Sequence, residues 1–323
     1  MSRTSLTDQL VDLRRARTGE NPSQAVPAVR AALASLSADD RAALVAALRD
    51  GVPVSDRIAD ALLPAATTTA QRELEARVLQ AVSDSAGYLH LRPPASITRS
   101  AHAVAAVQLD GPVVRLHPAP LAVGPLLYEL LPRTEAGQLL GLPGLRSRQH
   151  PRSAELFLVH EPGASVVLAG VDATGWEAAQ RYVRALLEHR GVPTERITGP
   201  ALTAAERAHL AEHGAVAGPA DAGSALLRRV HLFAAAPWLR VWGTDGQWWL
   251  DRPGDDDPAG TADRLLHPVF GLPGFGRSVD GPDVVSLSDG ATTVHLRAVQ
   301  APDPVLDERM AALRWPREYT PWE

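Results

Sequence analysis

The sequence contains no cysteine and no lysine. Without cysteine the chain can form no disulfide, no thiolate nucleophile and no cysteine-ligated zinc site. Without lysine it can have neither a phosphate-binding loop that depends on lysine nor a Schiff-base mechanism. All 32 basic residues are therefore arginine, whose planar guanidinium suits bidentate contacts with oxyanions. These two absences remove several large classes of enzyme.

The chain also lacks a long apolar run and a strong excess of charge of one sign. No stretch of 18 apolar residues occurs and no apolar signal segment follows the N-terminus, so we expect no membrane span and a cytoplasmic location. The net charge of −5 gives no general attraction to nucleic acid or to an anionic membrane. Hydrophobic residues make up 45% of the 323 residues, which is enough to build a sizeable core in one or two domains.

Motifs that mark a catalytic or cofactor site are missing as well. The sequence has no G-x-S-x-G nucleophile elbow, no dinucleotide-binding glycine motif after a strand and no HExxH metal motif. We therefore expect no cofactor and no metal site, and we favour a protein that is not an enzyme.

A helical region is predicted over residues 1–86. Asn21 followed by Pro22 is typical of a helix N-terminus, and Ser37 with an aspartate three residues later resembles a capping box. Apolar residues at helical spacing predict a further helix over residues 69–83.

A repeat begins after this region. The motif Gly-Leu-Pro-Gly occurs at residues 141–144 and again at residues 271–274. An Asp-Gly pair between two apolar runs precedes each copy, at residues 110–111 and 245–246. Asp-Gly in this setting is a strong hairpin signal, so we predict a strand, a turn and a second strand before each motif. A short helix with a Leu-Leu pair precedes each motif, and a second hairpin and a helix follow it.

The repeat defines the predicted fold. A further strand is expected at residues 88–91 and at residues 230–233, each preceded by a helix. The unit is then α-β-ββ-α-ββ-α, used twice with pseudo-twofold symmetry. We predict an α+β protein with three regions, namely helices over 1–86, a first repeat over 87–192 and a second repeat over 193–323.

The two hairpins of the second copy differ in the faces that they present. Side chains alternate along a strand, so the final hairpin has an apolar face and a polar face. The apolar face holds Val285, Leu287, Val294 and Leu296, and the polar face holds Ser286, Thr293, His295 and Arg297.

The tryptophan-rich hairpin is apolar on both faces. Its two-residue turn places Trp242 opposite Trp249 and Arg240 opposite Asp251. One face holds Trp238, Trp242 and Trp249, and the other holds Leu239, Val241, Trp248 and Leu250. Either both faces are covered inside the protein, or one face binds a partner, since exposed tryptophan faces are costly in water.

The C-terminal segment is rich in aromatic residues and proline, and it includes Trp315 and Trp322. It either packs back on the body or inserts into a neighbouring subunit. The candidate partner-binding residues are therefore Trp238, Trp242, Trp249, Trp315 and Trp322.

Arginines gather in the loop expected after the first Gly-Leu-Pro-Gly motif. The candidate anion-binding residues are Arg146, Arg148 and Arg152, together with Arg277 after the second motif. The alternative is a solvated loop with no ligand.

Three further arginines lie near the N-terminus. Arg14, Arg15 and Arg17 close the first predicted helix, where they could contact nucleic acid or could stabilise the helix dipole with no ligand.

Three hypotheses for the function follow. The first is a non-catalytic protein-binding, scaffold or chaperone-like protein with a protein partner or a second copy. The order of elements is similar to that of small secretion-chaperone folds, which bind unfolded or extended protein segments. The second is an enzyme whose site lies in a groove between the repeats, near Arg146, His150, Arg277 and Asp251. The third is a nucleic-acid-associated protein that uses the arginine-rich segments.

Overall fold

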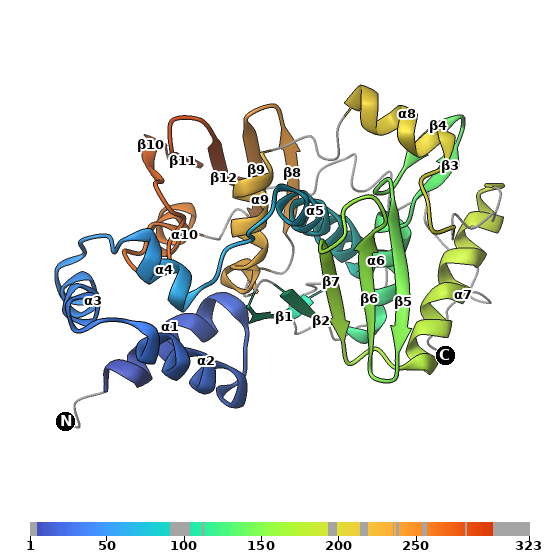
Figure 1. The fold of residues 1–323 in the computed structure, drawn as a ribbon. Coiled ribbons are helices and arrows are strands. Elements are labelled where there is room, and N and C mark those ends of the chain that lie inside the picture. The colour runs from blue at the N-terminus through green and yellow to red at the C-terminus, as the bar shows by residue number, and fades with distance from the viewer. Residues whose placement is uncertain are drawn as a thin grey trace.

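The computed structural model contains two five-stranded sheets, a two-stranded sheet, a group of N-terminal helices and further helices that pack between and beside the sheets (Figure 1). The residues that it describes are 5–90, 104–111, 113–192, 199–213, 219–234, 236, 239–253, 257–281 and 283–299. Helices and strands both form large parts of these residues, which confirms the predicted α+β class.

Four helices form the N-terminal group, which Figure 1 shows at lower left. They are α1 (Leu6–Thr18), α2 (Pro22–Ser35), α3 (Ala38–Asp50) and α4 (Asp56–Leu62). The predicted helix starts are confirmed: the side chain of Asn21 accepts a hydrogen bond from the N–H of Gln24, and the side chain of Ser37 accepts one from Asp40.

The first helix ends against the first sheet. Gly19 has a φ of 73°, which is the left-handed conformation that closes a helix. A Cβ atom at this position would come within 2.5 Å of the carbonyl oxygen of Ala105 in strand β1 (Val104–Asp110). Glycine is required here because the backbone both turns and approaches its neighbour closely.

The fifth helix, α5 (Thr69–His90), runs through the middle of the molecule (Figure 1). It continues past the predicted end at residue 83, and residues 88–90 are helical, so the strand predicted at 88–91 is wrong for the part that the structure describes. A short apolar alternation does not by itself distinguish a strand from the end of a helix. The predicted boundary at residue 86 falls inside α5, and the division into three regions stays a prediction.

Helix α9 (Ala220–Leu227) packs closely against α5. A Cβ atom on Gly223 would lie 2.6 Å from the Cβ of Ala76 and 2.5 Å from Cζ2 of Trp248. Next to this crossing, the buried carboxylate of Glu75 accepts hydrogen bonds from Arg228 at 2.5 and 2.7 Å. The two helices therefore fill the space between the first and the second half of the chain.

The first sheet has the strand order β1-β2-β7-β6-β5. Strands β2 and β7 pair in parallel and the other neighbours pair antiparallel. The remaining strands are β2 (Val113–Pro118), β5 (Leu145–His150), β6 (Ser153–Leu158) and β7 (Ser165–Ala169).

The second sheet has the order β10-β11-β12-β9-β8, with β9 and β12 in parallel. Its strands are β8 (Arg240–Thr244), β9 (Gln247–Pro253), β10 (Gly276–Asp280), β11 (Val284–Ser288) and β12 (Thr293–Val299). Read along the chain, this is the order of the first sheet, including the parallel pair. A repeated unit would give such an arrangement, and the duplication itself stays a prediction.

The two Gly-Leu-Pro-Gly segments make similar backbone contacts. Helix α6 (Val123–Leu130) precedes the first and helix α10 (Pro258–Leu265) precedes the second. The N–H of Leu142 donates to the carbonyl of the last residue of α6 at 2.9 Å, and the N–H of Leu272 donates to that of α10 at 2.7 Å. Each segment therefore turns the chain back from the end of a short helix.

The sequence did not predict every element of the two halves. A small hairpin of β3 (Arg133–Glu135) and β4 (Gln138–Leu140) separates α6 from the first motif. The helix predicted after the second hairpin of the first copy is α7 (Ala173–His189), and the remaining elements are η1 (Pro120–Ala122), α8 (Ala204–His213) and η2 (Val230–Phe233).

Three local predictions are corrected. Residues 230–233 form a 3-10 helix and not a strand. Asp110 pairs with Val113, so it belongs to β1 and not to the turn. The arginine-rich segment that begins at Arg146 lies mostly on strand β5 and not in a loop, because its residues up to His150 pair with β6.

The core joins both sheets and the N-terminal helices. The inner faces of the sheets are mostly apolar, and the final hairpin buries the four side chains predicted for its apolar face. The buried residues of the inner faces include Val114, Leu116, Val166, Leu168, Val241, Trp248, Leu250, Val285, Leu287, Val294 and Leu296.

Candidate functional site

Aromatic side chains line the outer face of the second sheet. The strand register places Trp242 of β8 beside Trp249 of β9, then His295 of β12, Ser286 of β11 and Val279 of β10. Because neighbouring residues across a sheet share a face, these five side chains form a line that crosses all five strands, which we call the aromatic row. The predicted pairing of the two tryptophans is confirmed.

The rings of the aromatic row stack on one another. The rings of Trp242 and Trp249 are nearly parallel, with an interplanar angle of 7° and centroids 6.1 Å apart. The ring of His295 lies 4.0 Å from that of Trp249 at an angle of 22°. Trp242, Trp249 and His295 are half-buried, whereas Val279 at the far end is 58% exposed. The row is therefore ordered by its own contacts and open at its end.

A second line of residues, the charged row, runs beside the aromatic row. It consists of Arg240 of β8, Asp251 of β9 and Arg297 of β12. Arg297 donates to both oxygens of Asp251, at 2.8 and 2.7 Å, and these bonds raise the pKa of Arg297. The guanidinium of Arg240 lies 4.8 Å from the centre of the Trp242 ring, and that of Arg297 lies 5.5 Å from the Trp249 ring. The indole rings thus hold two cations in fixed positions.

His295 occupies a special place in the aromatic row. Its Nδ1 lies 2.8 Å from Oγ of Ser286, and its buried Nε2 has no hydrogen-bond partner in the part of the chain that the structure describes. Burial lowers the pKa of His295, so the ring is neutral at pH 7. The contact with Ser286 and the stack on Trp249 therefore fix the orientation of the ring.

The tryptophan hairpin lies at the edge of the sheet, with one face buried. Trp248 is 1% exposed, and its Nε1–H donates to the carbonyl of Pro219 at 2.8 Å. The free edge of β8 is partly covered by α5, because the N–H of Val241 donates to Oγ of Ser83 at 2.6 Å. Whether the opposite face, which carries the aromatic row, is covered within the protein or binds a partner stays a prediction.

The other predicted partner-binding residues lie outside the described residues. These are Trp238, Trp315 and Trp322.

The structure does not bring the predicted anion-binding residues together. Arg148 stacks on Phe157 and donates to Glu155 at 3.2 Å, in a hollow of about 570 Å³ on the outer face of the first sheet. Arg152 lies in the β5–β6 turn, and Arg277 lies in the second sheet, where it pairs with Asp263.

Arg146 cannot take an external anion in this conformation. It is 5% exposed and makes five hydrogen bonds within the protein, two of them to Glu206 at 2.9 and 3.1 Å. Burial acts to raise the pKa of Glu206, but the bonds from Arg146 and from the N–H groups of Thr203 and Gly144 lower it to about 2. The pair joins β5 to the start of α8.

The residues proposed for an enzyme site between the repeats do not converge. Arg146 and His150 lie on β5, at the right of Figure 1, whereas Arg277 lies on β10, at the left. Asp251 is bound by Arg297. Helices α5 and α9 fill the space between the halves, which counts against a groove there.

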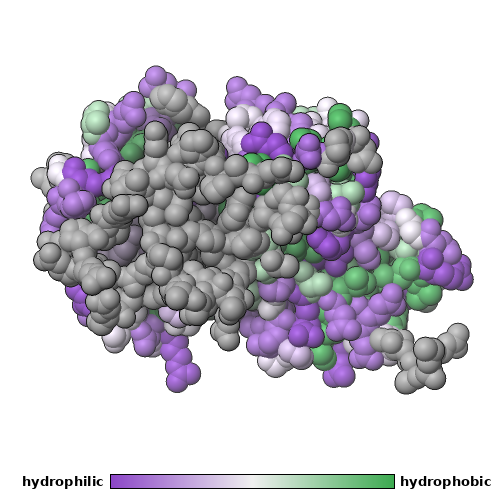
Figure 2. Space-filling view, turned by 180° about the vertical axis from the view of Figure 1, so that it is seen from behind, coloured by the Kyte–Doolittle hydropathy of each residue, from purple (hydrophilic) through white to green (hydrophobic). Residues whose placement is uncertain are grey.

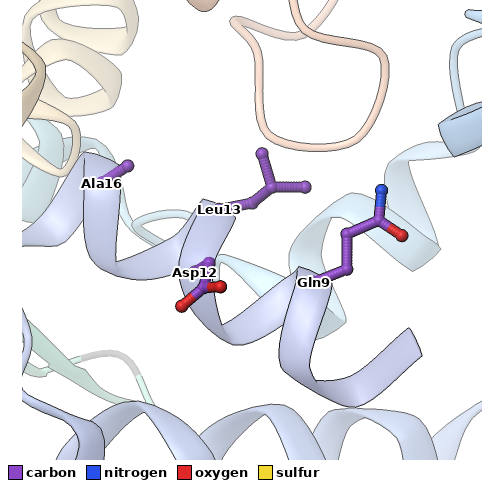
Figure 3. Close-up of a pocket in the computed structure, with 4 residues that line it drawn as sticks. All are labelled: Gln9, Asp12, Leu13 and Ala16. Carbon is purple, nitrogen blue, oxygen red and sulfur yellow. The ribbon is translucent and has the colours of Figure 1, made fainter. Parts of the chain in front are cut away.

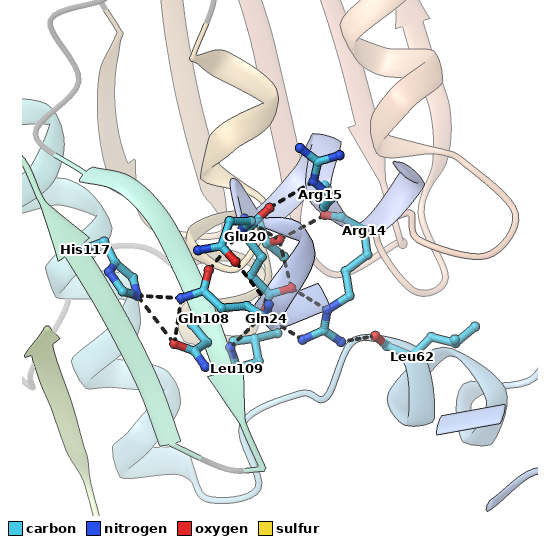
Figure 4. Close-up of polar contacts among 10 residues, drawn as sticks. Arg14, Arg15, Glu20, Gln24, Leu62, Gln108, Leu109 and His117 are labelled. Atoms are coloured by element: carbon cyan, nitrogen blue, oxygen red, sulfur yellow. Dashed lines mark hydrogen bonds and ion pairs between the residues drawn. The ribbon is translucent and has the colours of Figure 1, made fainter. Parts of the chain in front are cut away.

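The N-terminal arginines have structural roles (Figure 4). Arg14 is 2% exposed and donates to both oxygens of Glu20, at 2.5 and 2.9 Å. Arg17 is also buried, with its guanidinium 5.4 Å from the Phe270 ring. Of the three, only Arg15 is partly accessible, so a nucleic-acid contact through this cluster has little support.

Figure 4 also shows how this group holds the helices to the first sheet. Glu20 accepts a hydrogen bond from the N–H of Leu109 at 3.4 Å, and the side chain of Gln24 donates to that of Gln108 at 3.1 Å. The N-terminal helices are therefore fixed to strand β1.

A hollow of about 560 Å³ lies beside α1 (Figure 3). It is lined by Gln9, Asp12, Leu13 and Ala16. Figure 2 shows polar and apolar side chains interspersed on the side of the molecule where the N-terminal helices lie. One carboxylate, one carboxamide and two apolar side chains do not define a ligand.

Two further properties of the described residues bear on function. Among the described residues, no group of three or more histidine, aspartate or glutamate side chains is placed to hold a metal ion. None of the helices in the same residues combines the length and the apolar character needed to span a bilayer. The cytoplasmic location stays a prediction.

Comparison with protein-family models gives no match, and comparison with curated proteins and with solved structures gives no significant match.

Proposed function

We propose that this chain is a non-catalytic protein-binding protein whose partner docks on the aromatic row. The observation that carries the proposal is the stack of the half-buried rings of Trp242, Trp249 and His295 on the face of the second sheet opposite to the buried Trp248. Tryptophan and arginine are the residues most enriched where protein interfaces gain their binding energy.

The energetics of the face support this proposal. Apolar surface contributes about 25 cal/mol per Å² when it leaves water, so a half-buried pair of indoles has much to gain from a partner. The rings are already ordered by stacking and by the two arginines, so little further side-chain freedom is lost on binding. The face is thus arranged for binding before a partner arrives.

The first sheet offers a contrast that supports the choice of face. The residues in the corresponding line of its outer face are Gln108, Arg115, Val167, Glu155 and Arg148. Polar and charged side chains of this kind are ordinary for a wet sheet face.

The alternative of catalysis at the same face is less well supported. Ser286 and His295 form a serine–histidine pair at 2.8 Å, which is the contact that activates a nucleophile. However, Ser286 is only 2% exposed, so a substrate could not reach its hydroxyl.

The proposal is tested by comparing partner capture by tagged full-length variants. Trp242→Ala should lose a stoichiometric partner, with binding reduced at least about tenfold as expected for an interface tryptophan. Phe157→Ala, on the outer face of the first sheet, is the matched control and should retain the partner. Light scattering on each variant shows whether the occupant is a second copy of the chain.

Two results would contradict the proposal. One is a partner that Trp242→Ala retains as well as the wild type does. The other is a purified protein that has no partner and remains monomeric.

A further inference from the structure

Each five-stranded sheet has two edge strands, and three of these four edges are partly covered or irregular. At β1 the N–H of Leu109 donates to Glu20, and at β8 the N–H of Val241 donates to Ser83. Strand β10 has a register shift beside Ser278, and a bulge of this kind disfavours pairing with a further strand. The fourth edge, β5, pairs with β6 through six residues without any shift.

The backbone of β5 presents hydrogen-bonding groups on the side away from β6. The N–H of Val159, just after β6, donates to the carbonyl of Gly144 at 3.0 Å, and this bond sets the alternation of the ladder. The even-numbered residues of β5 therefore bond to β6, and the N–H and C=O groups of Ser147 and Gln149 point outward. Neither backbone has a hydrogen bond to any other described residue on that side, and Ser147 is exposed. Such groups form a template for one added strand.

The open part of this edge is short. At its start, the N–H of Leu145 is already bound within the chain, and residues 199–201 lie beside Arg146, which donates to two of their carbonyl oxygens. At its end, Pro151 has no N–H to donate. The edge thus fits a short extended segment and not the full side of another sheet.

Arg148 gives the open edge a chemical preference. Its side chain is 61% exposed, and its guanidinium lies 4.9 Å from the centre of the Phe157 ring. Among the described residues it donates one hydrogen bond, from Nη1 to Glu155 at 3.2 Å, so its other nitrogens can bind a second carboxylate. Ser147 and Arg148 both line the hollow of about 570 Å³, which leaves space beside the edge for an incoming side chain.

Charge argues against a second copy of this chain as the added strand. The outward groups belong to odd-numbered residues, so antiparallel pairing of two β5 edges would set even-numbered residues opposite even-numbered ones. Arg148 of one chain would then face Arg146, Arg148 or His150 of the other. Like charges directly opposite each other destabilise a strand pair, whereas opposite charges stabilise it.

We propose that, independently of a partner on the aromatic row, β5 pairs with an extended segment of another protein that places a carboxylate opposite Arg148. The main chain of the segment bonds to Ser147 and Gln149, and its carboxylate bonds to Arg148. The edge supplies the hydrogen bonds, and the arginine selects an acidic segment.

The test uses the full-length protein and three fluorescein-labelled pentapeptides, followed by fluorescence anisotropy. The first is Thr-Glu-Thr-Glu-Thr, the second has glutamine in place of glutamate, and the third is the first with its threonine nitrogens methylated. The glutamine peptide should bind about two- to fivefold less tightly than the glutamate peptide, because it lacks the cross-strand ion pair. The methylated peptide should bind at least about tenfold less tightly, because it cannot donate to the edge.

Three variants locate the binding. Ser147→Pro removes an N–H that points away from β6 and should abolish binding of the glutamate peptide. Arg148→Gln should make the glutamate and glutamine peptides bind equally. Arg115→Gln, a matched change on strand β2 of the same sheet, should change neither affinity. Circular dichroism and denaturant midpoints report whether each variant is folded, and the methylated peptide tests the same hydrogen bonds on the wild type.

Several results would overturn the proposal. They are no binding of the glutamate peptide, equal binding of its methylated form, or full binding by a folded Ser147→Pro protein. Equal affinity of the wild type for the glutamate and glutamine peptides would overturn the selection of an acidic segment. A dimer that Ser147→Pro dissociates would show that the occupant is a second copy.

The aromatic row is tested separately from this edge. Trp242→Ala should leave peptide binding unchanged, and peptide binding that Trp242→Ala abolishes while Ser147→Pro retains it would overturn the assignment to β5. Retention of a protein partner by Trp242→Ala would contradict only the proposed function.

Discussion

The close crossing of α5 and α9 leads us to expect that Gly223→Ala lowers the free energy of unfolding, which is opposite to the usual effect of this substitution in a helix. In a helix interior this change ordinarily stabilises a protein by about 0.5–1 kcal/mol, since alanine has the higher helix propensity. Here the new Cβ would lie 2.5 Å from Cζ2 of Trp248, 2.6 Å from the Cβ of Ala76 and 3.0 Å from its Cα. These contacts are far inside van der Waals distance.

The neighbours have little room to move away. The Trp248 ring is 1% exposed and held by its bond to the Pro219 carbonyl, and the Cα of Ala76 belongs to the backbone of α5. Overpacking of this kind costs about 1–3 kcal/mol, which outweighs the gain in propensity. We therefore expect a net loss of about 1–2 kcal/mol in the free energy of unfolding.

Urea denaturation of the full chain measures this loss as a lower midpoint at unchanged slope. Gly175→Ala in α7 is the control, because the nearest atom to its Cβ would be Oδ1 of Asp172 at 3.4 Å. It should be neutral or slightly stabilising. Combining Gly223→Ala with Ala76→Gly should reduce the loss. A Gly223→Ala protein as stable as the wild type would refute the close crossing of the two helices.

Two further predictions concern buried polar groups. Burial and the charge of Arg17 lower the pKa of His267 to about 4, and its Nδ1 accepts hydrogen bonds from the N–H groups of Val269 and Phe270. As the pH falls from about 6.5 to 4, the unfolded chain takes up a proton that the folded chain excludes, so stability is lost over that range. Because the ring is partly exposed to water, we expect a loss of about 1–2 kcal/mol in the free energy of unfolding. Denaturant midpoints at pH 7 and about pH 4.5 should show this loss in the wild type and a smaller loss in His267→Asn. An equal pH dependence of stability in both proteins would contradict the prediction. Arg146→Met should destabilise the protein by about 3–5 kcal/mol because it leaves the carboxylate of Glu206 buried without its partner. Arg148→Met on the same strand should cost less than about 0.5 kcal/mol, and similar thermal shifts for the two variants would contradict this account.

The sequence predicted the features that depend on neighbouring residues. The Asp245-Gly246 turn sets the register of Trp242 and Trp249, and alternation along the final hairpin sets its buried face. Helix caps at Asn21 and Ser37 follow equally local rules.

Features that depend on distant residues were not predicted. The parallel pairing of β9 with β12 brings His295 to Trp249, and no turn signal encodes such a contact. Arg146 is indistinguishable in sequence from a surface arginine until its distant partner Glu206 is known. Both hairpins that contribute to the aromatic row were predicted with their faces. Predicting the row itself would also have required the order of the hairpins in the sheet, which the sequence does not show.

The position of β7 and β12 has a consequence for synthesis of the chain. Each is the last strand of its sheet along the chain, yet each lies at the centre of that sheet and pairs with hairpins on both sides. Until residues 293–299 have left the ribosome, the nascent chain has both hairpins of the second sheet but lacks the strand that joins them. Premature termination before β12 would therefore remove the middle of the sheet instead of trimming its edge, and the exposed strand edges would make such products targets for aggregation or degradation.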